Sequence, residues 1–75
     1  MRLKIGTNIC AVLDANIFEE VSPNMIYFHV DGGLFIADYH NEDVAYSKLD
    51  ELFKMGYLDI TNDSSTLQYY DLGKE

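Results

Sequence analysis

Cysteine, proline and tryptophan are scarce in this sequence. Its 75 residues include one cysteine, one proline and no tryptophan. One cysteine forms no internal disulfide, and a small domain without disulfides is typical of the reducing interior of a cell. The longest uninterrupted apolar run covers residues 9–13, whereas a membrane-spanning helix needs ~20 apolar residues. We therefore expect a single small domain over residues 1–75 that is cytoplasmic and does not enter a membrane.

Basic residues are also scarce. There are 5 Lys and Arg residues against 13 Asp and Glu residues, which gives a formal net charge of -8. No Lys or Arg occurs between Lys4 and Lys48. A surface of this sign repels a phosphate backbone, because nucleic-acid binding depends on Lys and Arg side chains that displace counterions. We therefore expect no direct binding of nucleic acid.

The strongest local pattern is a hairpin in the middle of the chain. Two apolar, β-rich runs at residues 25–30 and 34–39 flank Asp31-Gly32-Gly33. Glycine adopts the positive φ of a tight hairpin turn at little cost. The turn centres on Asp31-Gly32 or on Gly32-Gly33, and both choices place the same side chains on one face. The face that we expect to be buried carries Ile26, Phe28, Val30, Phe35, Ala37 and Tyr39.

A helix is expected at about residues 42–55. Asn41 can cap its free N–H groups, acids follow at its positive end, and Gly56 can take the left-handed conformation that ends it. Its apolar residues recur at helical spacing. They are Ala45, Leu49, Leu52 and Phe53.

The C-terminal residues are expected to form a second hairpin. Residues 57–61 and 66–72 are the strands, and the polar residues 62–65 are the loop. This register produces favourable cross-strand pairs such as Leu58 with Tyr69. The face that we expect to be buried carries Leu58, Ile60, Leu67 and Tyr69.

Residues 3–21 fit two structures. Ile9, Val12, Leu13, Ile17 and Val21 follow a helical spacing, but residues 9–13 also form a strand-like run. Periodicity does not separate the two in so short a segment. We favour strands, because a meander provides the central hairpin with more partners. The expected fold is therefore α+β, an antiparallel β-meander or set of hairpins packed on one main helix.

Two stretches resemble known proteins. Residues 24–53 resemble small bacterial and phage proteins of unassigned function. The shared pattern is a strand, the Asp31-Gly32 turn, a second strand, the capping Asn41 and an Ala-x-x-x-Leu helix. That resemblance implies a β-meander with a packed helix. Residues 49–72 resemble the last helix and wing of winged-helix domains, in Leu52-x-x-x-Gly-Tyr-Leu and the later Leu-x-Tyr-Tyr. The second resemblance implies a winged-helix-like fold as the alternative fold, and a winged-helix-like regulator as an alternative function.

No catalytic or metal-binding pattern accompanies these elements. Cys10 lies in an apolar run without a neighbouring base, so it lacks what a thiol nucleophile requires. His29 and His40 have no ligand partners at a spacing that indicates a metal site. Gly32-Gly33 does not extend to a phosphate-binding loop. We therefore expect no enzyme activity, no catalytic residues, no bound metal and no cofactor.

The remaining hypothesis is a protein-binding module. In bulk character, a small, acidic chain with 6 tyrosines resembles inhibitors encoded by phages and mobile elements, and its carboxylates can imitate the phosphates of DNA. The expected partner is a protein with a basic surface, and the hypothesis requires that the acids gather into one patch. The candidate residues are Glu19, Glu20, Tyr27, Asp38, Glu42, Asp43, Tyr46 and Asp50.

The alternative is a module that associates with itself. Tyrosine is enriched at interfaces because it joins a large apolar body to a polar tip. On this hypothesis the outer faces that carry Tyr57 and Tyr70, and Leu34 and Ile36, pair across a two-fold axis as a homodimer.

Overall fold

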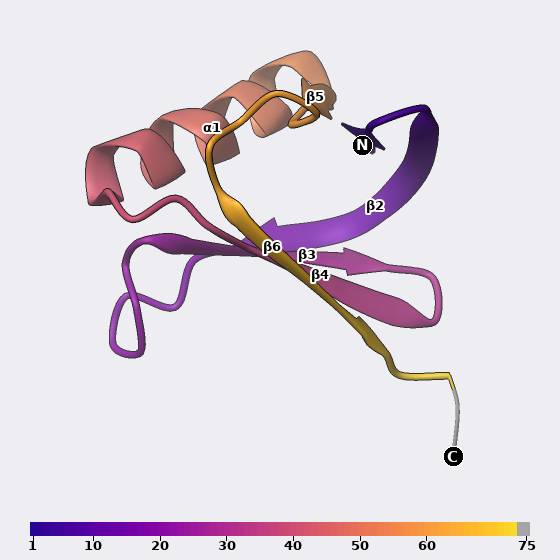
Figure 1. Cartoon of the computed structure of the whole chain (residues 1–75), viewed down its shortest axis with the longest axis horizontal. Coiled ribbons are helices and arrows are strands. Elements are labelled where there is room, and N and C mark those ends of the chain that lie inside the picture. Colours follow the sequence, from indigo (N-terminus) through magenta and orange to yellow (C-terminus); the bar gives the residue numbers. More distant parts are fainter. Residues whose placement is uncertain (74–75) are drawn as a thin grey trace.

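One helix packs on a six-stranded mixed sheet in the structure, a computed structural model that describes residues 1–73 (Figure 1). The strand order is β5-β1-β2-β3-β4-β6. This confirms the expected α+β class, although the sheet is mixed rather than wholly antiparallel. The elements are, in chain order, β1 (Arg2–Ile5), β2 (Asn8–Asn16), β3 (Met25–Val30), β4 (Gly33–Asp38), α1 (Glu42–Met55), β5 (Tyr57–Asp59) and β6 (Thr66–Asp71).

The ambiguous N-terminal segment forms strands. β1 and β2 pair antiparallel, with Leu3 opposite Cys10. The register between β2 and β3 shifts between Val12 and Asp14, and such a bulge bends a strand. Figure 1 shows the resulting curvature of β2. After β2 the chain leaves the sheet for residues 17–24, so the strand interpretation is confirmed through residue 16 and the rest is a loop.

The central hairpin is confirmed, and its turn centres on Asp31-Gly32. Val30 lies opposite Gly33, which leaves a two-residue connection. Gly32 has a φ of 72°, whereas Asp31 has no positive φ. The primed hairpin turns require positive φ at the first central residue, so this turn is of another type. Of the face expected to be buried, Val30 and Phe35 are half-buried and the other four residues are buried.

The helix is confirmed at Glu42–Met55. The Asn41 side chain accepts a hydrogen bond from the Val44 N–H at 3.2 Å, and the Gly56 N–H donates to the Leu52 carbonyl at 2.8 Å from a left-handed conformation. Ala45 and Leu52 are buried, but Phe53 is 53% exposed. Phe53 shares the apolar helical spacing but lies outside the core, because α1 packs on β5 and β3 through a narrower stripe.

The predicted C-terminal hairpin is wrong. Residues 57–61 and 66–72 do not pair; β5 runs parallel to β1 at one edge of the sheet, and β6 runs antiparallel to β4 at the other. In Figure 1 the chain crosses from β5 past α1 before it enters β6. The pairing that a winged-helix wing requires is therefore not formed.

Long-range burial explains this outcome. Leu58 lies opposite Leu3, and both side chains are fully buried. A local hairpin would leave the apolar inner side of β1 without that partner, and burying a leucine contributes about 1.5–3 kcal/mol. The long connection from β1 to β5, which ends in α1, provides the crossover that a parallel pair needs. On β6, Leu67 is half-buried but Tyr69 is 51% exposed, so the prediction of a buried Tyr69 is also wrong.

The core lies between α1 and one face of the sheet. Its largest fully buried side chains come from three strands and the helix. They are Phe28, Leu3, Ile26, Leu52 and Leu58.

Candidate functional site

Two segments that are far apart in sequence form an acidic end of the molecule. Met25 lies opposite Asp38 in the β3–β4 pair, and the Tyr39 N–H donates to the Asn24 carbonyl at 2.9 Å. The loop of residues 17–24 and the connection of residues 38–43 therefore lie at the same end of the sheet (Figure 1). The acids that define this acidic end are Glu19, Glu20, Asp38, Glu42 and Asp43.

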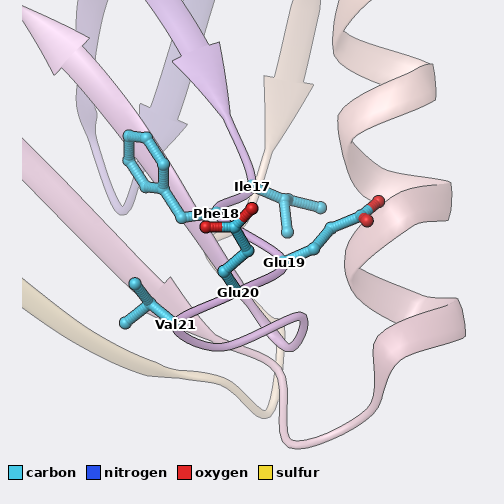
Figure 2. A pocket seen from close by; sticks show the side chains of 5 residues that line it. All are labelled: Ile17, Phe18, Glu19, Glu20 and Val21. Atoms are coloured by element: carbon cyan, nitrogen blue, oxygen red, sulfur yellow. The ribbon is translucent and has the colours of Figure 1, made fainter.

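A hydrogen bond ties the loop to the helix. The Tyr46 hydroxyl on α1 donates to the Glu19 carboxylate. That bond, with burial and the negative charges of Glu19 and Glu42, raises the pKa of Tyr46 to about 12. Figure 2 shows the Glu19 side chain extending toward α1. Tyr46 therefore holds one carboxylate of the acidic end in place.

The loop itself is hollowed and carries apolar side chains beside its acids. A hollow of ≈ 380 Å³ is lined by residues 17–21 (Figure 2). The Val21 N–H donates to the Phe18 carbonyl at 3.0 Å, which closes the turn. Phe18 is 46% exposed and Val21 is 75% exposed. The Phe18 ring meets the Tyr27 ring edge-on, with centroids 4.9 Å apart, so β3 supports the base of the loop.

His40 occupies the other segment of the acidic end. It is the non-glycine residue with a positive φ (58°) within residues 1–73, and its N–H donates to Asp38 Oδ1 at 2.9 Å. Its ring places Nδ1 3.6 Å from Asp38 Oδ2 and Nε2 3.1 Å from Thr66 Oγ1. The ring therefore lies between the end of β4 and the start of β6. No three His, Cys, Asp or Glu side chains group as metal ligands in the part of the chain that the structure describes.

The basic side chains pair elsewhere. Within residues 1–73, no Lys or Arg forms a salt bridge with an acid of the acidic end. Arg2 lies over the Tyr57 ring at 5.7 Å. The lysine pairs are Lys4–Asp59 at 3.9 Å, Lys48–Asp63 at 3.2 Å and Lys54–Asp50 at 2.9 Å.

Two of these acids have further partners. The Thr61 hydroxyl and N–H donate to Asp59 at 2.6 and 2.9 Å, and they lower the pKa of the Asp59 carboxyl. Asp63 also accepts from the Tyr39 hydroxyl at 2.9 Å. These acids thus serve the fold, whereas the five acids of the acidic end have no Lys or Arg partner among residues 1–73.

The structure brings together six of the eight predicted site residues. The five acids of the acidic end are joined by Tyr46. Asp50 lies apart because it pairs with Lys54 on an exposed turn of α1. Tyr27 is half-buried on the sheet face opposite the core, beside Phe18.

Sequence reasoning missed Phe18 and Val21. Their one signal was two apolar residues flanking two acids in a segment with no clear strand or helix pattern. The surface proposed for self-association is also divided, because Tyr57 and Tyr70 belong to strands at opposite edges of the sheet. Leu34 lies opposite Tyr70, and Ile36 lies opposite both Gln68 and Tyr27. Leu34, Ile36 and Tyr70 therefore share one face of the sheet with Tyr27.

No protein-family model, curated protein or solved structure matches this chain. Among residues 1–73, no helix has the length and apolar character needed to cross a lipid bilayer.

Proposed function

We propose that this chain is a non-enzymatic cytoplasmic module whose acidic end binds the basic surface of a protein partner. In its specific form, it inhibits a nucleic-acid-binding protein by occupying the groove that holds the phosphates, as inhibitors from phages and mobile elements do. The observation that carries the proposal is the charge distribution. Five carboxylates gather at one end, and in the described residues the lysine salt bridges are all made with other acids.

The electrostatics favour such an interaction. A concentrated negative field steers a basic partner toward the site and suppresses binding of acidic ones. Lys and Arg side chains that bind phosphate also bind carboxylate, with the planar Arg group forming paired hydrogen bonds. The acidic end therefore presents the chemistry that a phosphate-binding groove recognises.

The apolar residues of the loop add contact area. Most of the free energy of a protein interface comes from a few well-packed anchors, and charges at its rim contribute less. Phe18 and Val21 project from the same turn as Glu19 and Glu20. We propose that Phe18 is the anchor and that the surrounding carboxylates set the orientation of the partner.

Capture experiments test this function. The protein, immobilised, is exposed to the nucleic-acid-binding proteins of the organism that encodes it. The test variant Glu20→Gln/Asp43→Asn removes two exposed acids of the acidic end. The matched control Asp14→Asn/Glu51→Gln removes two exposed acids elsewhere, so both variants have the same net charge.

We expect wild type and the control to capture the same protein, and the test variant to lose it. Bound partner should be released by duplex DNA and by salt, because screening shortens the field from ~10 Å at 0.1 M to ~3 Å at 1 M. Equal capture by the two variants, or a bound partner that duplex DNA does not displace, contradicts the proposal.

A further inference from the structure

The outer edge of β6 has unused hydrogen-bonding groups. The Leu72 N–H donates to the Gly32 carbonyl at 2.9 Å, so the even-numbered residues of this strand face β4. Because backbone groups alternate along an antiparallel strand, the N–H and C=O groups of Leu67, Tyr69 and Asp71 point away from β4. Within residues 1–73, no further strand or loop pairs with them.

The edge also lacks the features that prevent strands from pairing. Native proteins protect sheet edges with short strands, lysine, proline, bulges or a covering helix. The opposite edge is protected in this way, since β5 has 3 residues and packs against α1. β6 has 6 residues with no lysine or proline, and it keeps a regular register with β4 throughout. Tyr69 and Tyr70 on β6 are 51% and 47% exposed, and Leu72, which follows the strand, is 65% exposed.

The charge of β6 selects its occupant. Residues 66–70 carry no charge, so a basic segment would find its complement at the acidic end and not on this edge. An identical strand does fit. Antiparallel pairing about a two-fold axis normal to the sheet keeps the core-facing side chains of both copies on the same side.

We propose that β6 pairs antiparallel with β6 of a second copy of this chain, centred on Tyr69. Each Tyr69 then lies opposite Tyr69 of the second copy, and Leu67 lies opposite Asp71 of the second copy. This register engages all three outward-facing residues of each strand. A register centred on Gln68 would engage only Leu67 and Tyr69.

The register also keeps like charges apart. Asp38, at the acidic end, lies opposite Thr66 at the start of β6. The two-fold axis reverses the strand direction, so the acidic ends of the two copies point away from each other. The Tyr69 ring lies 4.6 Å from the Phe35 ring, so the pairing extends a row of aromatic side chains across the axis. The result is one continuous sheet that leaves both acidic ends free.

Sedimentation equilibrium over a concentration series tests the dimer. The matched variants are Tyr69→Glu and Tyr69→Gln, since both lose the ring but only the first places two carboxylates directly across the axis, which is destabilising. We expect twice the chain mass for wild type, a dimer for Tyr69→Gln and loss of the dimer for Tyr69→Glu, with circular dichroism confirming that each variant is folded. A wild type that stays monomeric, or equal association of the two variants, overturns the proposal.

Disulfide trapping tests the register. In a Cys10→Ser background, Tyr69→Cys places two thiols on a hydrogen-bonded pair with Cα atoms ~5.5 Å apart, a separation that a disulfide spans. Gln68→Cys places them on a diagonal at ~7–8 Å, which a disulfide does not span. We expect rapid crosslinking at 69 and little at 68 under a mild oxidant. Faster crosslinking at 68, or none at either position, overturns the register.

Salt separates this inference from the proposed function. Two copies with a formal charge of -8 each repel one another, so dimerisation strengthens as salt rises. Binding of a basic partner weakens under the same change. A dimer constant that falls with added salt contradicts a contact centred on the uncharged residues 66–70, whatever the capture experiment shows.

Discussion

The two edge strands of the sheet, β5 and β6, differ in how far their core-facing side chains are buried. At the β5 edge, Leu58 is fully buried beneath α1. At the β6 edge, Tyr69 stays half-exposed on the same face. Six strands ~4.8 Å apart span about 24 Å, whereas a helix with its side chains is ~10–12 Å across. One helix therefore covers only part of this sheet. The edge strand β6 lies beyond the helix, so its apolar side chains are buried less or are covered by another molecule.

This difference in burial predicts that alanine substitution of Leu58 lowers the free energy of unfolding far more than alanine substitution of Leu72. Leu58→Ala should lower the free energy of unfolding by about 2–5 kcal/mol, because it leaves a cavity under the helix. Leu72→Ala, at a position that is 65% exposed, should change it by less than ~0.5 kcal/mol. Urea denaturation followed by circular dichroism measures both. Equal losses would mean that the β6 edge is as well packed as the β5 edge.

Tyr39 provides a second test. It follows β4, and its hydroxyl group donates to Asp63 in the connection between β5 and β6. The Tyr39 side chain is 8% exposed. Tyr39→Phe should cost about 1.5–3 kcal/mol at neutral pH, as expected for a hydrogen bond to a charged group. The control is Tyr46→Phe, which removes a more exposed hydroxyl that also donates to a carboxylate. Denaturation of Tyr39→Phe should show the larger loss; a reversed order contradicts the burial difference.

The raised pKa of Tyr39 predicts that the free energy of unfolding falls at alkaline pH. Burial, and then the hydrogen bond to Asp63, raise the pKa of Tyr39 above its ordinary value of 10.0. The folded state therefore binds this proton more tightly than the unfolded state. Its stabilisation is fully present below about pH 10 and is lost as pH rises toward the folded pKa. Urea midpoints of wild type and Tyr39→Phe should converge above pH 10, and a constant gap would show that Tyr39 does not titrate as described.

Gly56 provides a test of the helix end that leads into β5. Its φ is 68°, and an added Cβ would meet no atom within 4 Å. Gly56→Ala should therefore cost about 1–2 kcal/mol, which is the backbone penalty of the left-handed conformation alone. Gly73→Ala, at the β6 side, serves as the control because an added Cβ would make ordinary contacts at 3.6 Å or more. Thermal denaturation compares the two, and a null effect at Gly56 would mean that α1 ends differently.

The smallest effect is expected on the exposed face of α1. Lys54→Ala removes the pair with Asp50, in which both side chains are more than half exposed. Such i,i+4 pairs contribute about 0.3–0.5 kcal/mol, and salt screens them. The loss should therefore disappear at high salt in the same denaturation assay. A larger or salt-independent loss would assign Lys54 a packing role.

Local patterns predicted the elements that depend on neighbouring residues. The Asn41 cap, the acids of the first turn and Gly56 predicted α1 at its observed bounds, because capping and left-handed ends use atoms a few positions apart. The Asp31-Gly32 turn and period-two alternation predicted the β3–β4 hairpin for the same reason. The C-terminal hairpin failed because its two strands looked complementary to each other but found better partners far away in sequence.

The candidate site shows the same division. Charge counting indicated which stretch lacked basic residues, and it selected Glu19, Glu20, Asp38, Glu42 and Asp43. Asp50 pairs instead with Lys54 in the same helix, an ion pair that their i,i+4 spacing already favours. Charge counting did not place Tyr46 against Glu19, because that contact joins residues 27 positions apart.

Capping, turn geometry and charge are properties of short stretches, so the helix, the central hairpin and the excess of acids could be predicted from the residues alone. Which edge each C-terminal strand joins, and which acids share one end, depends on how the whole chain packs. Those outcomes depend on burying apolar surface between distant residues, such as Leu3 and Leu58. That free energy is gained only when the whole chain is folded.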